Sequence, residues 1–120
     1  MGAKIKVEKG KTRSGELIGS IHVEYSKLKA VNISKKLSPY LIDEYPILSI
    51  AASVAKGTTK MNGLEELRYK ESDRIKSIHE NLKKLKINCS VKKDDISITG
   101  STINPNGGVK IKTFGDHRIA

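Results

Sequence analysis

The chain has 120 residues, of which 37% are hydrophobic and 4% aromatic, and it contains no tryptophan and one cysteine. This length allows one modest domain with an aliphatic core, and the lone Cys89 excludes an internal disulfide or a cysteine-based zinc site. The formal net charge of +10 favours a polyanion, an anionic small molecule, or a generally basic proteome as its explanation.

The first third of the sequence alternates apolar and polar residues in short runs, which is typical of β-strands. Strands are predicted at residues 3–8, 17–25 and 29–33, and a turn or loop at 10–15. The run 35–39, which ends in Pro39, breaks this pattern.

The most apolar segment follows, and it predicts a helix over Pro46–Ala55. Asp43 is a candidate N-cap, and Pro46 suits the first helical turn. Almost no residue of this segment is charged, so we expect the helix to be buried nearly all round. Lys56 and Gly57 end it.

The second half predicts another helix, at about 71–86, with one apolar stripe at helical spacing. The stripe consists of Ile75, Ile78, Leu82 and Leu85. Strands are expected at 58–61, 87–92, 96–99 and 109–112, a turn at 62–63 and a loop at 100–108. Residues 115–120 open one more element, which we expect to be the beginning of a helix.

A weak internal repeat connects the two halves, because residues 1–7 resemble residues 85–91. Val31–Ile33 also precedes Asp43 as Val109–Ile111 precedes Asp116. We therefore predict an α/β (α+β) fold built from βαβαββ units. The expected division is the end of one unit (1–28), a complete unit (29–100) and the start of a third (109–120), within a larger protein.

Charged residues cluster at three expected helix starts, at 43–44, 70–74 and 116–118. Free backbone N–H groups and the helix dipole favour anions at such places. Two arginines suit a small polyanion, and neighbouring carboxylates can act as acid and base. Taken singly, each cluster is more simply explained by helix capping and surface ion pairs. Three together favour a site.

Four segments carry a resemblance to a known family. They are Leu-Ile-Asp-Glu-Tyr-Pro-Ile-Leu (41–48), Ala-Lys-Gly-Thr-Thr (55–59), Asn-Gly-Leu-Glu-Glu-Leu-Arg-Tyr-Lys-Glu-Ser-Asp-Arg (62–74) and Gly-Asp-His-Arg-Ile-Ala (115–120). In this order they closely resemble the 5-enolpyruvylshikimate-3-phosphate (EPSP) synthase family. The resemblance implies two domains of three βαβαββ units each, in an inside-out barrel, with this chain as an incomplete second domain.

The resemblance also implies the activity. The family transfers the enolpyruvyl group of phosphoenolpyruvate to the 5-hydroxyl of shikimate 3-phosphate through a tetrahedral intermediate, releases phosphate, and uses no cofactor. By resemblance, Asp43 accepts the hydroxyl proton and helps to hold shikimate 3-phosphate. Lys70 contacts that substrate, and Glu71 exchanges a proton with the methylene carbon of phosphoenolpyruvate. Without the first domain, we expect the 120 residues alone to be inactive.

Further roles follow from the same resemblance. Arg74 and Arg118 are expected to clamp phosphoenolpyruvate, and Asp116 and His117 to lie in the same wall. We expect His117 to be a hydrogen-bonding partner, because the sequence shows no metal-ligand spacing. For Asp73 the simpler role, complementing the helix dipole, is adopted.

Two alternatives remain for function. The related enolpyruvyl transferase that acts on UDP-N-acetylglucosamine shares the fold and the reaction type. A basic nucleic-acid-binding module would explain the charge, but aromatic residues are few and the charge is dispersed. No apolar run is long enough to span a bilayer, and Met1–Lys4 lacks the apolar core of a secretory signal. We expect a monomeric cytoplasmic protein with no nucleic-acid or membrane partner.

Overall fold

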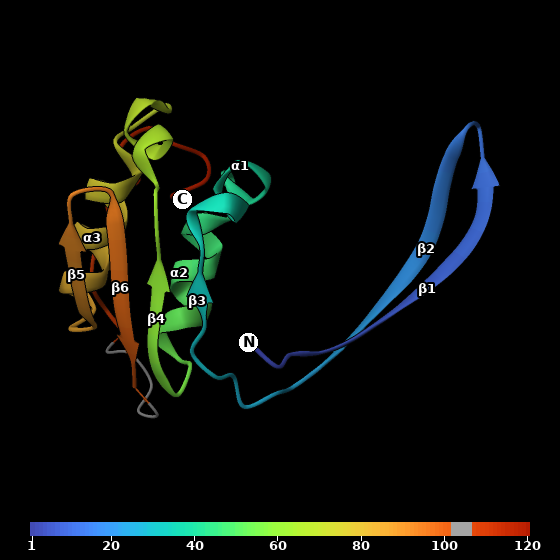
Figure 1. The fold of residues 1–120 in the computed structure, drawn as a ribbon, viewed down its shortest axis with the longest axis horizontal. Helices are drawn as coiled ribbons and strands as arrows, with labels where there is room; N and C mark the ends of the chain where they lie inside the picture. The colour runs from blue at the N-terminus through green and yellow to red at the C-terminus, as the bar shows by residue number, and fades with distance from the viewer. Residues whose placement is uncertain (102–106) are drawn as a thin grey trace.

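A computed structural model describes residues 1–101 and 107–120 of the chain (Figure 1). Two parts are distinct in it, a long N-terminal hairpin and a packed body. The elements in chain order are β1 (Lys4–Arg13), β2 (Glu16–Glu24), β3 (Asn32–Ile33), the 3₁₀ helix η1 (Lys35–Leu37), α1 (Ser38–Leu41), α2 (Tyr45–Ser53), β4 (Gly57–Met61), the 3₁₀ helix η2 (Glu65–Tyr69), α3 (Arg74–Lys84), β5 (Asn88–Lys92) and β6 (Asp95–Gly100).

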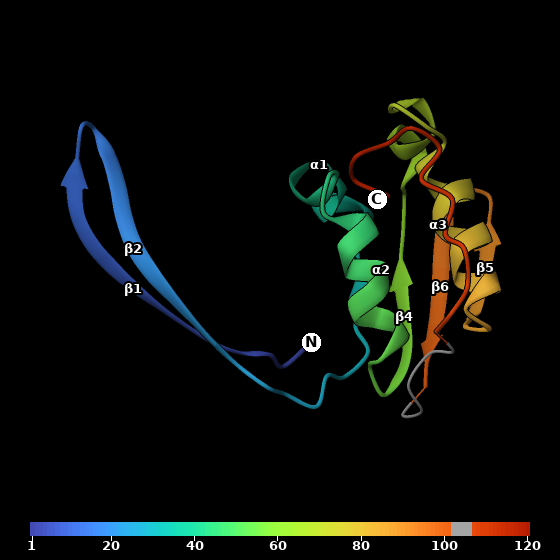
Figure 2. The ribbon, with the colours of Figure 1, turned by 180° about the vertical axis from the view of Figure 1, so that it is seen from behind.

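The body is a four-stranded sheet with the strand order β3-β4-β6-β5. β3 runs parallel to β4, whereas β6 is antiparallel to both of its neighbours. Helices α2 and α3 lie together on one face of this sheet (Figure 2). From β3 to β6 the main elements therefore follow the order β-α-β-α-β-β, and the predicted α/β class is confirmed.

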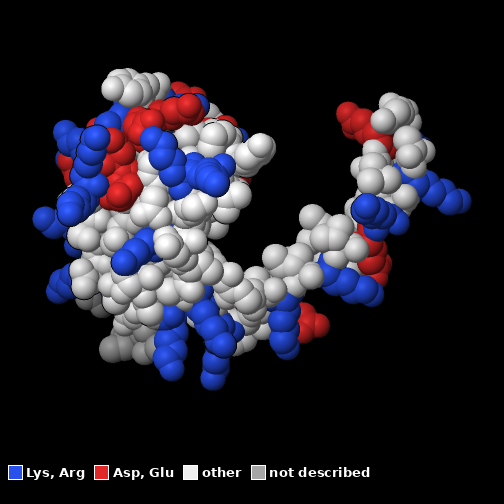
Figure 3. Space-filling view, in the orientation of Figure 1, with Lys and Arg blue, Asp and Glu red and all other residues white. Residues whose placement is uncertain are grey.

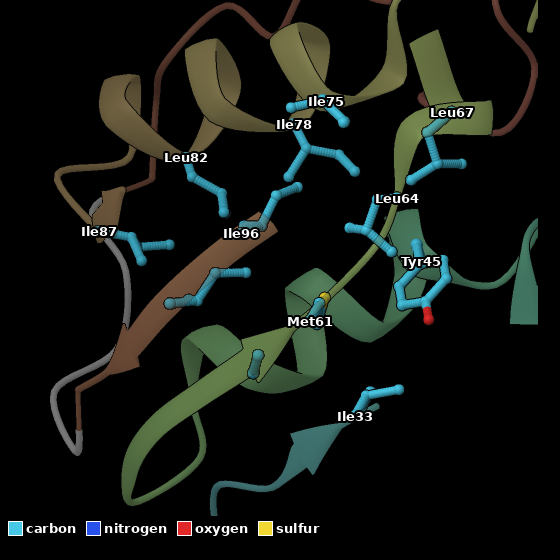
Figure 4. Close-up of a cluster of buried hydrophobic side chains, with 12 residues drawn as sticks. Ile33, Tyr45, Met61, Leu64, Leu67, Ile75, Ile78, Leu82, Ile87 and Ile96 are labelled. Carbon is cyan, nitrogen blue, oxygen red and sulfur yellow. The ribbon is translucent and has the colours of Figure 1, made fainter. Parts of the chain in front are cut away.

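The core fills the space between the sheet and the two helices (Figure 4). Ile75, Ile78 and Leu82 of α3 are buried against Ile96 and Ile98 of β6. Each such side chain contributes about 1.5–3 kcal/mol by leaving water. The predicted apolar stripe of α3 is thus confirmed at these three positions. The fourth residue, Leu85, directly follows the helix and is only partly buried.

Helix α2 differs from the prediction in two ways. Ile47 and Ile50 are 62% and 50% exposed, so the helix is not buried all round. It covers one face of a single sheet, and these two side chains line an open pocket between α2, α3 and the C-terminal segment. The expected N-cap role of Asp43 is also wrong: Glu44 occupies the cap position without a side-chain bond, because the Asp43 carboxylate faces Arg74 instead.

The segment after β6 also departs from the prediction. Residues 109–112 form no strand, because no described strand runs beside them. Instead they lie along α3, where the Asn81 amide donates to the Lys112 carbonyl and accepts from its N–H (2.8 and 3.0 Å). Residues 115–120 form turns instead of a helix start. Much of the expected loop at 100–108 lies outside the described residues.

The N-terminal hairpin stands away from the body (Figure 1). β1 and β2 pair antiparallel, with Ile5 opposite Val23 and Val7 opposite Ile21, so these four side chains share one face. Every residue of both strands is exposed. The hairpin is therefore a two-stranded sheet whose apolar face nothing covers in the described chain.

None of the helices in the described ranges has the length and apolar character that crossing a bilayer requires. Cys89 lies in β5, as the sequence predicts, and burial raises the pKa of its thiol to about 11. A thiol with this pKa stays protonated at neutral pH, which favours a packing role for Cys89 over that of a reactive thiol.

Candidate functional site

The segment between β4 and α3 positions the central residue of the candidate site. Gly63 turns the chain with a φ of +70°, where a Cβ would also collide with the Lys35 side chain. Asp73 then caps α3, accepting from the Lys76 backbone N–H at 3.0 Å. Asp73 was expected only to complement the helix dipole, and the structure shows that it is also the N-cap, with Arg74 as the first helical residue.

Arg74 is 1% exposed and is surrounded by three carboxylates. Its Nε and Nη2 donate to the two oxygens of Asp116 at 2.8 and 3.2 Å. Nη1 donates to Asp43 at 2.9 Å, and Nη2 also donates to Glu71 at 2.7 Å. Four of the five guanidinium N–H groups are therefore engaged, and the buried charge is fully paired.

This arrangement keeps the carboxylates ionised. The hydrogen bond from Arg74 lowers the pKa of Asp116 to about 2, with help from the Arg118 backbone N–H and the Ser72 hydroxyl. The same guanidinium holds the pKa of Asp43 below its usual value, and the charges of Arg118 and Lys70 act in the same direction. Asp116 and Asp43 are thus negatively charged at neutral pH.

Arg118 is bound more loosely than Arg74. Its side chain is 40% exposed, and its ion pairs are long: Nη2 lies 3.7 Å from Asp43 and Nη1 lies 3.6 Å from Glu44. Its backbone N–H donates to Asp116 at 2.9 Å, which anchors the turn that carries it. An exposed guanidinium with long contacts can exchange them for an incoming anion.

The remaining predicted residues lie at the margin of this network. Lys70 and Glu71 are exposed, although Glu71 reaches Arg74. His117 is exposed too, and within the described ranges it makes no hydrogen bond or ion pair. The structure therefore brings together five of the predicted residues, Asp43, Glu71, Arg74, Asp116 and Arg118, with Lys70 nearby and His117 turned out.

Sequence reasoning missed two contributors. Ser72 donates to Asp116 at 3.0 Å, within the same cluster. Arg68 bonds to Asp73 and Asp94 at 3.1 and 2.8 Å, just behind it. Only their positions within the charged run 63–74 marked them. The contacts of Ser72 with Asp116 and of Arg68 with Asp94 join residues more than twenty positions apart, and such contacts cannot be read from local spacing.

The cluster lies at the end of the body that carries η2, where acidic and basic side chains gather side by side (Figure 3). Among the described residues, no group of three histidine, cysteine, aspartate or glutamate side chains could hold a metal ion. Cations set among ionised carboxylates can bind a small anion, and the carboxylates can exchange protons with it.

Comparisons with known proteins all find similarity to the same family. A family model described as EPSP synthase (3-phosphoshikimate 1-carboxyvinyltransferase) matches residues 1–120. The 3-phosphoshikimate 1-carboxyvinyltransferases of Clostridium tetani and Petrotoga mobilis are each 45% identical over 120 residues, the whole of this chain. A solved EPSP synthase from Acinetobacter baumannii superimposes on 99% of the chain with a TM-score of 0.89 and 39% identity.

The matched region is a limited part of each relative. The chain covers 27% of the Clostridium protein, 28% of the Petrotoga protein and 28% of the Acinetobacter structure. The agreement nevertheless extends over the full length of this chain in both sequence and fold. The chain therefore belongs to the EPSP synthase family.

Proposed function

We propose that this chain forms one wall of an enolpyruvyl-transfer site in a larger protein. The reaction is transfer of the enolpyruvyl group from phosphoenolpyruvate to the 5-hydroxyl of shikimate 3-phosphate, with release of phosphate. The observation that carries this proposal is the Arg74 cluster, in which Asp43, Glu71 and Asp116 surround one guanidinium beside the exposed Arg118. Family membership supports the choice of substrates.

Asp43 is proposed to take the proton from the attacking hydroxyl and to help bind shikimate 3-phosphate. Its lowered pKa keeps it in the ionised form that can accept a proton. Its two oxygens face different arginines, Arg74 and Arg118. The Asp43 carboxylate is therefore oriented from two sides. It lies next to Arg118, which is proposed to bind phosphoenolpyruvate.

Glu71 is proposed to exchange a proton with the methylene carbon of phosphoenolpyruvate, and Lys70 to contact shikimate 3-phosphate. Glu71 is half exposed while its Oε2 touches Arg74. One oxygen is thus held by the cluster and the other can face a ligand. The exposed Lys70 lies close enough for its charge to act on Asp43.

The two arginines are proposed to bind phosphoenolpyruvate by different means. Arg118 exchanges its long contacts with Asp43 and Glu44 for the anion. Arg74 has one N–H group without a partner among the bonds described above. A second N–H group becomes available to the ligand when Glu71 turns away to act on the substrate. Asp116, wholly buried, keeps Arg74 in place during this exchange. The exposed His117 is proposed to act as a hydrogen-bonding partner in the same wall only when the site is occupied.

We assign the chain to part of the second of two domains. The division proposed is the end of one unit (1–28), a complete βαβαββ unit (29–100) and the start of the next (109–120). Uncovered apolar surface supports it: Ile21 and Val23 of the hairpin are 69% and 67% exposed. Since this chain spans about a quarter of its relatives' length, the 120 residues alone should show no turnover.

The remaining expectations concern partners and compartment. We place the protein in the cytoplasm as a monomer, with no nucleic-acid or membrane partner. The support is a single, partly buried cysteine and a basic charge that is spread along a sequence with few aromatic residues.

Phosphate release by the full-length protein tests the proposal. With phosphoenolpyruvate and shikimate 3-phosphate, we expect turnover and a product that carries the enolpyruvyl group. Turnover with UDP-N-acetylglucosamine instead would overturn the choice of substrate. No turnover with either, together with a salt-dependent affinity for RNA or DNA that survives loss of Arg74 and Arg118, would favour a nucleic-acid-binding role.

A further inference from the structure

Arg68, in η2, holds three acceptors on two other segments of the body. Its Nε donates to Asp94 Oδ1 at 2.8 Å, its Nη1 to Asp73 Oδ2 at 3.1 Å and its Nη2 to the Lys93 carbonyl at 2.5 Å. The side chain is 32% exposed. Each of its three nitrogens therefore has a partner, in a partly buried place outside the cluster around Arg74.

The acceptors on one side belong to a firmly held turn. Lys93 and Asp94 connect β5 to β6, and Lys93 has a φ of +55°. The same turn receives two further bonds: the Leu64 N–H donates to the Asp94 carbonyl at 2.8 Å and the Gly63 N–H to Asp95 Oδ1 at 2.7 Å. The turn is thus a fixed support for the segment that leads to α3.

The acceptor on the other side is the N-cap of α3. Asp73 uses Oδ1 to bind the Lys76 N–H and Oδ2 to bind Arg68. Arg68 and Asp73 therefore close the four residues between them, 69–72, into a loop. That loop carries Lys70 and Glu71.

We propose that Arg68 is a positioning residue for this reaction: its guanidinium fixes the 69–72 loop, and so places Lys70 and Glu71 against the Arg74 cluster. The proposal rests on the function proposed above for the roles of those two residues. Arg68 itself touches no proposed substrate-binding group. A guanidinium offers three nitrogens in a rigid planar fork that reaches all three acceptors, whereas a lysine has one nitrogen on a flexible stem.

The test compares variants of the full-length protein in steady-state phosphate release. Arg68→Ala and Arg68→Lys should both lower kcat by about tenfold or more, because an ångström of misplacement is enough for losses of that size. The matched control is Lys35→Ala. It removes one positive charge from an exposed pair that joins η1 to η2, Lys35–Glu65 at 3.2 Å, and should leave kcat within about twofold.

Chemical rescue separates positioning from general stability. Low millimolar guanidinium ion should fill the space between Asp73 and Asp94 in Arg68→Ala and restore much of the lost kcat. It should not activate Arg68→Lys or the original protein. A variant with unchanged kcat, or one whose loss tracks its melting temperature and resists rescue, overturns the proposal.

A second readout does not depend on activity. Amide hydrogen exchange in the full-length protein should become faster across residues 69–77 in Arg68→Ala and unchanged in Lys35→Ala, since Lys76 and Ser77 donate to Asp73. Unaltered exchange there contradicts the positioning role. If exchange becomes faster in Arg68→Ala as expected but the original protein shows no turnover with shikimate 3-phosphate, the proposed function fails and the positioning role of Arg68 stands.

Discussion

The hairpin and the Arg74 cluster both contain pairs of opposite charges close together, but the surroundings of these pairs differ. In the hairpin, Lys4 and Glu24 lie 3.6 Å apart with 69% and 75% of their side chains exposed. In the cluster, Arg74 and Asp116 lie 2.8 Å apart with 1% and 0% exposed. Water screens the first pair and is excluded from the second, so two ion pairs of the same charge contribute very differently to stability.

The comparison also separates two kinds of incomplete surface. The hairpin exposes Ile5 and Val7 at 56% and 63%, which are apolar side chains without a described partner. The cluster exposes Arg118 and Glu71, which are charged side chains beside a buried anchor. An apolar face requires another segment of protein to cover it, whereas exposed charges on a rigid base suit a small anion. The variants below test this distinction, and all are variants of the full-length protein.

Replacing Arg74 should have the largest effect. Arg74→Met leaves Asp116 buried without a countercharge, so we expect a loss of about 3–5 kcal/mol in the free energy of unfolding. Urea denaturation followed by circular dichroism measures it. A loss below about 1 kcal/mol would mean that the ion pairs of the cluster contribute no more to stability than the exposed pairs of the hairpin.

The second-largest effect should be the contribution of Asp116 to the pH dependence of stability. Its pKa is about 2 when folded and 3.8 when free, so the folded state favours the ionised form. The resulting stability is present above pH 4 and is lost as pH falls from about 4 to about 2, with a size on the order of 2 kcal/mol. Urea denaturation between pH 5 and pH 2 measures this loss.

The Asp116→Asn variant is the matched control for this titration. It lacks the group that titrates, so its stability should be lower at neutral pH and should change less between pH 4 and pH 2. An equal pH dependence in both proteins would assign the effect to other carboxylates, and the low pKa of Asp116 would be wrong.

Asn81→Ala should have an intermediate effect. It removes both bonds to the Lys112 backbone, which together contribute about 1–2 kcal/mol. Amide exchange at Lys112 should also become faster, because its N–H loses its acceptor. The control is Asn88→Ala, at an exposed position of β5. Equal effects at both positions would show that Asn81 does not hold the 109–113 segment.

Lys4→Ala in the hairpin should have the smallest effect. Its partner Glu24 is mostly exposed, so the expected change in the free energy of unfolding is below about 0.5 kcal/mol. The same urea denaturation measures it. A change as large as that of Arg74→Met would show that the hairpin charges become buried against other parts of the protein.

The sequence predicted those features that depend on local spacing. Ile75, Ile78 and Leu82 follow the period of a helix, so α3 was expected close to its observed place. The α/β class followed from the same periodicities. The resemblance selected the charged residues that the fold brings together.

What the sequence did not predict depends on contacts between distant segments. Ile47 is as apolar as a core residue, but whether a second layer covers it is not encoded in its neighbours. Asp43 has the chemistry of an N-cap, yet a buried guanidinium 31 positions away competes for it. Arg68 gave no signal beyond its charge, because two of its three partners come from the β5–β6 turn.

The most direct test of the central claim, that the Arg74 cluster does chemistry as well as stabilise, is kcat for Glu71→Gln in the full-length protein. The amide keeps the size of Glu71 and an oxygen that can accept from Arg74, but it cannot exchange the proton. We predict a fall in kcat of about 10²–10⁴, with the unfolding free energy within about 1 kcal/mol of the original. An unchanged kcat would contradict the account, and the cluster would then be a structural ion-pair network.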